Sequence, residues 1–217
     1  MARRIAFIHL RLRLRAAIAV GVSLLMATQM AAVVQAADNM GWKWQVNDEY
    51  GYYYRIAYYP ESGLPTAFKN RVYEAGLNWN AVWTHLFFEQ QPAADGRTDM
   101  RIKWTNYGWP WENSCAMADT AGATGVIVSA TIYFDSVSPC GSTWYSGTGT
   151  PPTGTIDALT AAIHEFGHAV ELYHSASPYA NHSEAAMWPY LPISPATRRY
   201  LAAWDKAGVK AIYPSIP

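Results

Sequence analysis

The residues with the clearest chemical potential lie in the segment HEFGHAVELYH, which runs from His164 to His174. His164 and His168 are four residues apart, so on a helix both imidazoles lie on one face and can reach the same ion. A zinc ion held by three neutral protein ligands keeps a fourth position for water and lowers the pKa of that water to about 7. Glu165 can point toward this water. The pattern therefore predicts a hydrolytic zinc site with a zinc-activated water and Glu165 as general base.

The third ligand depends on where the helix ends. His174 is ten residues beyond His164, which is about 15 Å along an uninterrupted helix. It can reach the ion only if the helix stops near Ala169 or Val170. A sharp exit from a helix usually uses a glycine at positive φ, but Glu171 occupies that position.

Two alternatives follow for the third ligand. In the first, Glu171 adopts the left-handed conformation at a cost of roughly 1–2 kcal/mol, and His174 binds the metal. In the second, the helix continues and Glu171, seven residues after His164 and on the same face, binds instead. Zinc sites in folded peptides contribute on the order of 10 kcal/mol, which is enough to offset the strain. We therefore favour His174.

The helix that carries these residues is predicted at 157–170, because the carboxylate of Asp157 can cap its first turn. Apolar spacing predicts further helices at 66–85 and from Ser194-Pro195 to about Tyr213. Strands are predicted at 52–59, 86–89, 100–105 and 126–134. The segment 140–154 is rich in glycine, serine, threonine and proline, and is predicted to be an exposed loop. This order of elements predicts an α+β fold, or a layered α/β arrangement.

The N-terminus has the composition of an export signal. Five arginines and no acidic residue lie in the first fifteen positions, followed by a mostly apolar run at 16–34 and small residues before Ala36. This pattern predicts a signal peptide at 1–36, removed near Ala36, and hence a secreted protein. The alternative is an uncleaved membrane anchor, since nineteen mostly apolar residues nearly span a bilayer.

The remaining residues, 37–217, are predicted to form one domain. They carry 11 basic and 16 acidic side chains, a net charge of −5, which argues against nucleic-acid binding. The chain has two cysteines, Cys115 and Cys140. Export favours a disulfide between them, and two buried free thiols are the alternative.

The histidine segment, followed at once by Ser175, resembles that of the metzincins, and within them the matrixin-like zinc endopeptidases. Ala186-Met187-Trp188-Pro189 is similar to the methionine turn of these enzymes. Weaker resemblance extends over most of the mature chain, including YYYRIAYY at the first predicted strand and Asp205 near the end. The histidine motif is the specific part of this resemblance.

The resemblance implies zinc ligands His164, His168 and His174, catalytic Glu165, and Met187 as the apolar floor beneath the metal. It implies a metzincin-like fold: a twisted, mostly parallel five-stranded sheet, an active-site helix, and a C-terminal helix after the methionine turn. An antiparallel edge strand, expected within 126–134, would border the cleft and bind an extended substrate. Pro189 and Tyr190 would wall the pocket for the side chain beyond the scissile bond.

Some features of the family are not matched. Residues 108–124 lack the histidine cluster of a second, structural zinc. Calcium is possible, with Asp119 and Asp135 as candidate ligands. His85 and His182 have no partner pattern and are expected to be structural or solvated.

The leading prediction is a secreted zinc-dependent endopeptidase that acts on proteins or peptides. It is expected to be a monomer without stable membrane association after signal cleavage. The main alternative is a catalytically inactive metzincin-like module that binds peptide or glycan. A third alternative is a purely structural cell-surface protein. It would not explain why three histidines and a glutamate occur at this spacing. Glu165 argues against the inactive module, because a module that only binds does not need a general base.

Overall fold

The part of the chain described by the structure, a computed structural model, comprises residues 41–45, 54–94, 98–106, 114–137, 139–177, 180–181, 183–192 and 197–214. The predicted signal peptide at 1–36, the predicted helix start at Ser194-Pro195, and His182 lie outside these residues. Within the described residues, no helix is long and apolar enough to cross a membrane.

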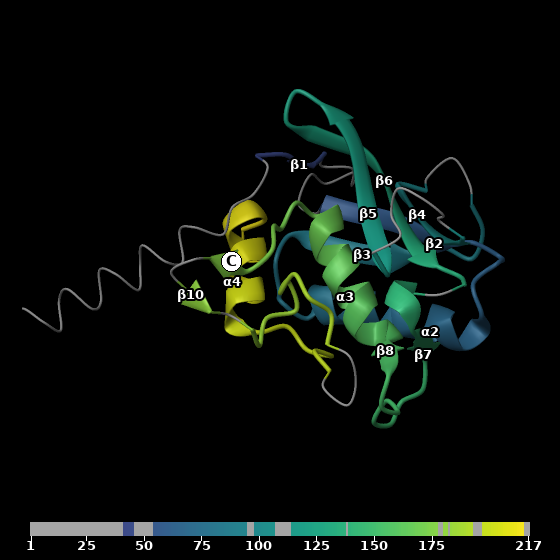
Figure 1. The fold of residues 1–217 in the computed structure, drawn as a ribbon. Coiled ribbons are helices and arrows are strands. Elements are labelled where there is room, and N and C mark those ends of the chain that lie inside the picture. The colour runs from purple at the N-terminus through teal and green to yellow at the C-terminus, as the bar shows by residue number, and fades with distance from the viewer. Residues whose placement is uncertain are drawn as a thin grey trace, which may run out of the picture. The chain divides into compact units, whose positions relative to one another are not determined.

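A mostly parallel sheet forms the framework of the fold (Figure 1). Its strands follow the order β1-β6-β4-β2-β3. The strand β5 lies off this path and pairs with β6. The bounds are β1 (Lys43–Trp44), β2 (Tyr54–Pro60), β3 (Leu86–Gln90), β4 (Met100–Thr105), β5 (Ala116–Ala123) and β6 (Val126–Asp135). Every pairing is parallel except that of β5 with β6. The expected mostly parallel sheet is therefore present, with the two-residue β1 as a sixth strand.

The location predicted for the antiparallel edge strand is wrong. Residues 126–134 fall in β6, which is an interior strand between β4 and β5, and the edge is β5. In Figure 1 the β5–β6 hairpin projects past the other strands. The sequence of β5, AMADTAGA, contains one β-branched residue and no aromatic residue. Its extended conformation is therefore set by pairing with β6 rather than by intrinsic strand propensity.

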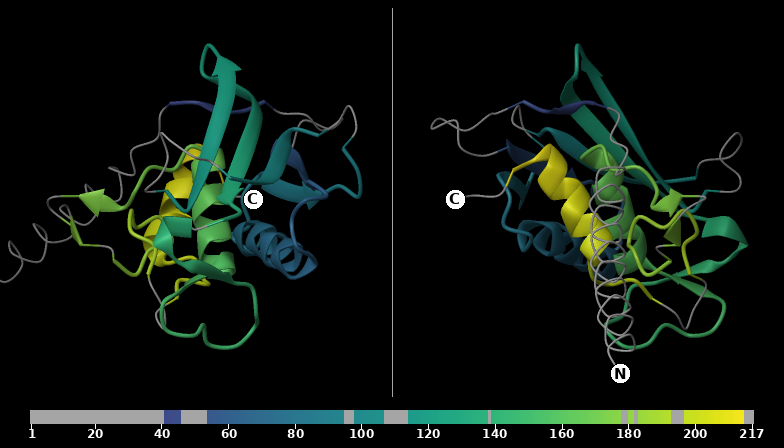
Figure 2. Two further views of the ribbon diagram at one scale, coloured as in Figure 1. Left: turned by 45° about the vertical axis from the view of Figure 1, so that its right-hand side comes forward. Right: turned by 90° about the vertical axis from the view of Figure 1, so that its left-hand side faces the viewer.

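Three helices are described: α2 (Thr66–Asn80), α3 (Ala158–Ala169) and α4 (Ala203–Ile212). The helices α2 and α3 lie together on one face of the sheet (Figure 2). Phe68 of α2 packs edge-on against Phe134 of β6, and Phe166 of α3 packs edge-on against Tyr58 of β2. The indole of Trp79 donates a hydrogen bond of 3.0 Å to the carbonyl of Ile163, which joins the two helices. The core therefore lies between the sheet and these helices.

The helix predicted at 66–85 ends earlier, at Asn80. The side-chain amide of Asn80 makes two hydrogen bonds with the backbone of Phe88 in β3: it accepts from the N–H at 2.8 Å and donates to the C=O at 2.9 Å. Trp83 then adopts φ 59°, which turns the chain into β3. Contacts with the sheet therefore set the end of α2.

The final helix begins later than predicted, at Ala203 rather than near Ser194. The backbone N–H of Ala202 donates to the carboxylate of Asp205 at 2.8 Å, which fixes the first turn. Residues 197–202 are not helical. The proline at 195 led to the prediction of an earlier start. The hydrogen bond from Ala202 to Asp205 instead fixes the start of α4 at Ala203.

The segment 140–154 contains short elements within the predicted loop. A 3-10 turn, η1 (Pro139–Gly141), precedes β7 (Thr143–Tyr145), which pairs in parallel with β8 (Thr155–Asp157). The guanidinium of Arg199 holds the loop by donating to the carbonyls of Thr148 and Gly147. Two further short strands, β9 (Ala176–Ser177) and β10 (Ala180–Asn181), pair antiparallel after α3.

Candidate active site

The start of α3 is fixed as the sequence predicts. Asp157 caps the helix, with its carboxylate accepting from the N–H of Thr160 at 3.0 Å. Arg199 donates to both oxygens of the same carboxylate, at 3.0 and 2.6 Å. Asp157 is 1% exposed. The buried charge is therefore paired, and α3 is anchored at its first turn.

The end of α3 has the geometry of a Schellman motif. Glu171 has φ 72°, its N–H donates to the carbonyl of His168 at 2.9 Å, and the N–H of Leu172 donates to the carbonyl of Gly167 at 3.0 Å. This is the left-handed alternative for Glu171, and the alternative with a continuing helix is wrong. A non-glycine residue at this position costs about 1 kcal/mol or more. The turn redirects the chain so that His174 returns toward α3.

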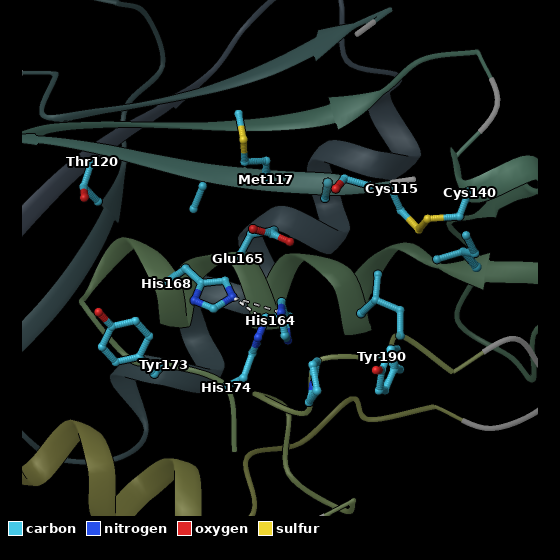
Figure 3. A pocket seen from close by; sticks show the side chains of 16 residues that line it. Cys115, Met117, Thr120, Cys140, His164, Glu165, His168, Tyr173, His174 and Tyr190 are labelled. Atoms are coloured by element: carbon cyan, nitrogen blue, oxygen red, sulfur yellow. Dashed lines mark hydrogen bonds between the residues drawn. A yellow bond between two sulfur atoms is a disulfide. The ribbon is translucent and has the colours of Figure 1, made fainter. Parts of the chain in front are cut away.

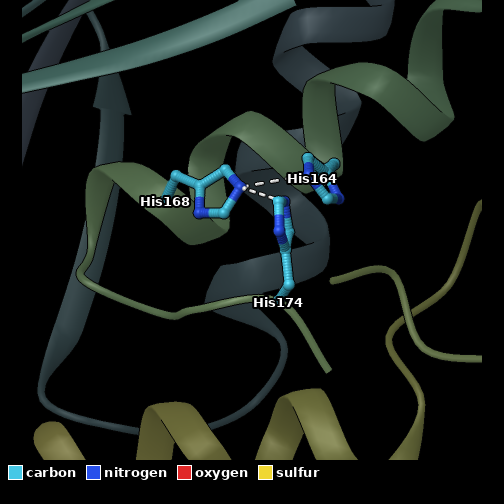
Figure 4. A group of neighbouring side chains, drawn as sticks. All are labelled: His164, His168 and His174. Carbon is cyan, nitrogen blue, oxygen red and sulfur yellow. Dashed lines mark hydrogen bonds between the residues drawn. The ribbon is translucent and has the colours of Figure 1, made fainter. Parts of the chain in front are cut away.

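His164, His168 and His174 converge on one point (Figure 4). Nε2 of His168 lies 3.1 Å from Nε2 of His164 and 3.1 Å from Nε2 of His174. These three residues could hold a metal ion. Nitrogen ligands 2.0–2.1 Å from a tetrahedral zinc are about 3.3 Å apart. The histidine cluster therefore fits zinc, and the cluster is the one group of this kind among the described residues.

The other ring nitrogens orient two of these imidazoles. Nδ1 of His164 lies 2.7 Å from the carbonyl of Ala186, and Nδ1 of His168 lies 2.8 Å from the carbonyl of Leu172. A proton on Nδ1 satisfies each carbonyl and leaves Nε2 with its lone pair toward the cluster. Burial, then the neighbouring His168, lowers the pKa of His164 well below its usual value. Burial, then the neighbouring His174, lowers the pKa of His168 to about 4. Both imidazoles are thus neutral near pH 7, as a metal ligand must be.

Glu165 lies between α3 and β5, next to the cluster (Figure 3). It is 4% exposed, and burial raises the pKa of its carboxyl to about 8, while a hydrogen bond from the backbone of Ala118 opposes this shift. Desolvation is therefore the larger effect. A carboxyl group poised in this range can both accept and return a proton near neutral pH.

Met187 packs against Gly167 of α3 and is fully buried. A Cβ added to Gly167 of α3 would lie 2.2 Å from Sδ of Met187, so only glycine allows this close approach. The carbonyl of Met187 accepts from the N–H of Ser175 at 2.8 Å, directly after His174. The methionine turn therefore supports both the helix and the returning histidine.

Asp205 of α4 holds the methionine turn in place. Its carboxylate accepts from the N–H groups of Ala186 at 2.9 Å and Met187 at 3.1 Å, as well as from Ala202. Burial raises the pKa of Asp205, and these backbone hydrogen bonds oppose the rise. Because the carbonyl of Ala186 is the partner of His164, Asp205 positions that histidine through the backbone.

A pocket of about 620 Å³ opens beside the cluster. Its wall is mainly apolar, and Cys115 and Cys140, which form a disulfide, are part of it. Figure 3 shows Tyr173 and Tyr190 on opposite sides of the histidines. The pocket is lined by Ser114, Cys115, Ala116, Met117, Ala118, Thr120, Cys140, Ile156, His164, Glu165, His168, Tyr173, His174, Pro189, Tyr190 and Leu191.

The free edge of β5 borders this pocket. The N–H of Asp135 donates to the carbonyl of Cys115 at 3.0 Å, so this pair is hydrogen-bonded across the hairpin. Residues of an antiparallel strand alternate between bonding the partner strand and facing away from it. The backbone groups of Ala116, Ala118 and Thr120 therefore face outward. The hydrogen bond from Ala118 to Glu165 agrees with this assignment.

The side chain of Glu171 also reaches β5. It is 1% exposed, and its Oε1 accepts from the hydroxyl of Thr120 at 3.2 Å. Its Oε2 is buried and has no hydrogen-bond partner among the residues that the structure describes. Burial raises the pKa of Glu171, and the bond from Thr120 opposes this shift. An incompletely paired buried carboxyl costs about 1–3 kcal/mol.

Most of the predicted site residues line one pocket: His164, His168, His174, Glu165, Pro189, Tyr190, Cys115 and Cys140. Met187 packs behind it, against Gly167 of α3. The candidate calcium ligands do not gather with other ligands in the described part of the chain: Asp119 is exposed on β5, and Asp135 accepts from the N–H of Val137. His85 lies before β3, outside the site.

The positions of Thr120 and Tyr173 in the pocket wall, and the contact of Asp205 with the methionine turn, were not predicted. Tyr173 could have been predicted, because it directly precedes the predicted ligand His174. Thr120 could not, because its contact with Glu171 spans 51 residues.

The comparisons with known proteins agree with this geometry. No curated protein matches the chain. The matrixin peptidase family matches residues 43–214, which include the sheet, α3, the histidine cluster and α4. The chain therefore belongs to the matrixin family, whose members are zinc metallopeptidases.

Proposed function

We propose that the protein is a secreted zinc-dependent endopeptidase with Glu165 as its catalytic residue. The observation that carries this proposal is the convergence of three histidine Nε2 atoms beside a buried glutamate, on the wall of a pocket bordered by a free strand edge. A module that only binds peptide would not need a carboxyl at this place.

His164, His168 and His174 would hold the zinc through their Nε2 atoms. When bound, zinc supplies a Lewis acid that polarises the scissile carbonyl and lowers the pKa of water. The carboxylate of Glu165 takes a proton from the attacking water and returns it to the nitrogen of the leaving amine. Its buried position stabilises the protonated form, which carries the proton between these two steps.

An extended peptide would bind along β5. The outward N–H and C=O groups of Ala116 and Thr120 can accept another strand, which gives backbone recognition without dependence on side chains. Pro189 and Tyr190 would contact the side chain that follows the scissile bond, and both line the pocket. Since the lining is mainly apolar, we expect uncharged side chains to be preferred there.

Secretion is supported by two features of the chain. The N-terminal 36 residues have the composition of a signal peptide. The Cys115–Cys140 disulfide fits an oxidising compartment. We propose a monomer that acts on proteins or peptides and has no stable membrane association after signal cleavage.

The decisive experiment measures zinc content and cleavage of an unfolded protein by the mature chain. The wild type should bind one zinc and cleave in a manner that a chelator abolishes. Glu165→Ala should retain the zinc and lose cleavage by a factor of about 10² or more, because a general base contributes that much. Cleavage by Glu165→Ala at the wild-type rate would disprove the mechanism.

The ligand assignment has its own matched pair of variants. His174→Ala should lose zinc, whereas Glu171→Ala should keep it. The reverse result would show that Glu171 is the third ligand.

A further inference from the structure

Glu171 is an unfavourable residue for the turn it occupies. The turn needs only positive φ, which glycine supplies without strain, yet a side chain is present and is almost fully buried. One of its carboxyl oxygens is left without a hydrogen-bond partner among the described residues. A residue that breaks two local rules at the edge of an active site indicates a function for the side chain itself.

The carboxylate of Glu171 accepts a hydrogen bond of 3.2 Å from the hydroxyl of Thr120, on the edge strand β5. Thr120 is a pocket-lining residue, and its backbone faces outward at the edge where a substrate strand would add. Directly beyond it, the pairing of β5 with β6 shifts register between Ala121 and Gly122. Glu171 therefore holds β5 near the end of its regular pairing with β6, one residue before the last pair in register, Ala121 with Ser129.

The composition and position of β5 give it little support of its own. It is rich in alanine and glycine, and within the described residues it pairs only with β6. At its other end it is anchored by the disulfide from Cys115. The bond between Glu171 and Thr120 is thus a second anchor, which ties the strand to the turn that leads to His174.

We propose that Glu171 is a positioning residue that fixes the substrate-binding edge of β5 relative to the proposed metal site. This inference rests on the proposed function, because it assigns Glu171 to substrate alignment by that site. It predicts that loss of the side chain weakens binding of extended peptides while the metal site stays intact. The hydroxyl of Thr120 is the partner through which Glu171 acts.

The test compares Glu171→Gly, Thr120→Val and the double variant with the wild type. Each single variant should raise the KM for an extended peptide about two- to tenfold, the range expected for one lost hydrogen bond, with a smaller change in kcat. The double variant should raise the KM by no more than either single variant does, because both changes remove the same hydrogen bond. Zinc content should stay at one per chain, and Glu171→Gly should unfold at the same or a higher temperature.

Two conservative variants serve as controls. Glu171→Gln retains a carbonyl oxygen that accepts from Thr120, and Thr120→Ser retains the hydroxyl, so both should keep the KM near the wild-type value. A purely structural role for Glu171 predicts instead that Glu171→Gly leaves the KM unchanged. That result, or additive effects in the double variant, would overturn the proposal.

Two readouts without catalysis separate this proposal from the proposed function. Amide hydrogen exchange at 116–121 should become faster in Glu171→Gly and Thr120→Val. The dissociation constant of the extended peptide, measured in a Glu165→Ala background, should rise by the same factor as the KM. If the wild type cleaves nothing, the proposed function fails. Unchanged exchange and unchanged peptide affinity would then reject the role of Glu171 as well.

Discussion

Gly167 shows how one residue of α3 can decide the geometry of the site. It lies one residue before the ligand candidate His168 and faces the methionine turn. A Cβ at this position would meet Sδ of Met187 at 2.2 Å and a ring carbon of Trp79 at 3.0 Å. Both side chains are fully buried, so neither can move away easily.

We expect Gly167→Ala to be destabilising although alanine is the better helix former. Overpacking a buried site typically costs about 1–3 kcal/mol, which exceeds the gain in helix propensity of about 1 kcal/mol. Thermal unfolding and zinc titration of the purified variant would measure the loss of stability and of zinc affinity.

Gly63→Ala is the control for this change, because its Cβ would come no closer than 4.0 Å to another described atom. Wild-type stability of Gly167→Ala would show that Met187 has room to shift.

At the scale of elements, α4 supports the active site although it contributes no pocket-lining residue. Asp205 joins its first turn to the methionine turn by two backbone hydrogen bonds, from the N–H groups of Ala186 and Met187. The carbonyl of Ala186 then orients His164, and the carbonyl of Met187 binds the chain after His174. His164 and His174 therefore depend on Asp205, a residue more than thirty positions further along the sequence.

Asp205→Ala should lower both the stability and the zinc affinity of the protein. The substitution leaves backbone N–H groups unpaired in the interior, each at a cost of about 1–3 kcal/mol. Denaturant unfolding would give the first effect, and competition with a chelator the second. Lys206→Ala, an exposed change in the same helix turn, should alter neither. Equal zinc affinity in Asp205→Ala and the wild type would show that the methionine turn holds His164 without α4.

At the scale of the whole molecule, one covalent link and the proposed metal site constrain regions that are distant in sequence. The Cys115–Cys140 disulfide spans 25 residues and encloses the β5–β6 hairpin. Because both cysteines line the pocket, the link affects the pocket as well as the stability of the chain.

Replacing both cysteines with serine should destabilise the protein by about 3.5 kcal/mol, the loop-closure contribution for a loop of this length. Urea unfolding of the metal-loaded variant would measure this change. Since β5 also loses its anchor, the KM for an extended peptide should rise. An unchanged KM would show that pairing with β6 alone keeps the edge in place.

Metal binding should stabilise the folded chain by mass action. With free zinc at about a thousand times its dissociation constant, the gain is about 4 kcal/mol. Thermal unfolding with and without a chelator should therefore show a large shift in the wild type. His168→Ala should show a much smaller shift, and equal shifts in both proteins would place the zinc elsewhere.

Much of the site could be predicted because it is encoded locally. The spacing of His164 and His168 on one helix, the cap at Asp157 and the need for a turn before His174 all follow from short-range geometry. The interior strands could be predicted for the same reason, since they are rich in apolar, aromatic and β-branched residues. The conformation of Glu171 followed from weighing local strain against metal binding.

The edge strand, the end of α2, the start of α4 and the contacts of Asp205 and Thr120 could not be predicted from the sequence. Each depends on a partner far away in sequence: β5 needs β6, Asn80 needs Phe88, and Asp205 needs the methionine turn. Such pairings leave no periodic pattern in the sequence, because a single hydrogen bond imposes no repeat on its neighbours. Short-range geometry thus predicts the candidate site residues, whereas long-range pairing places β5 beside them.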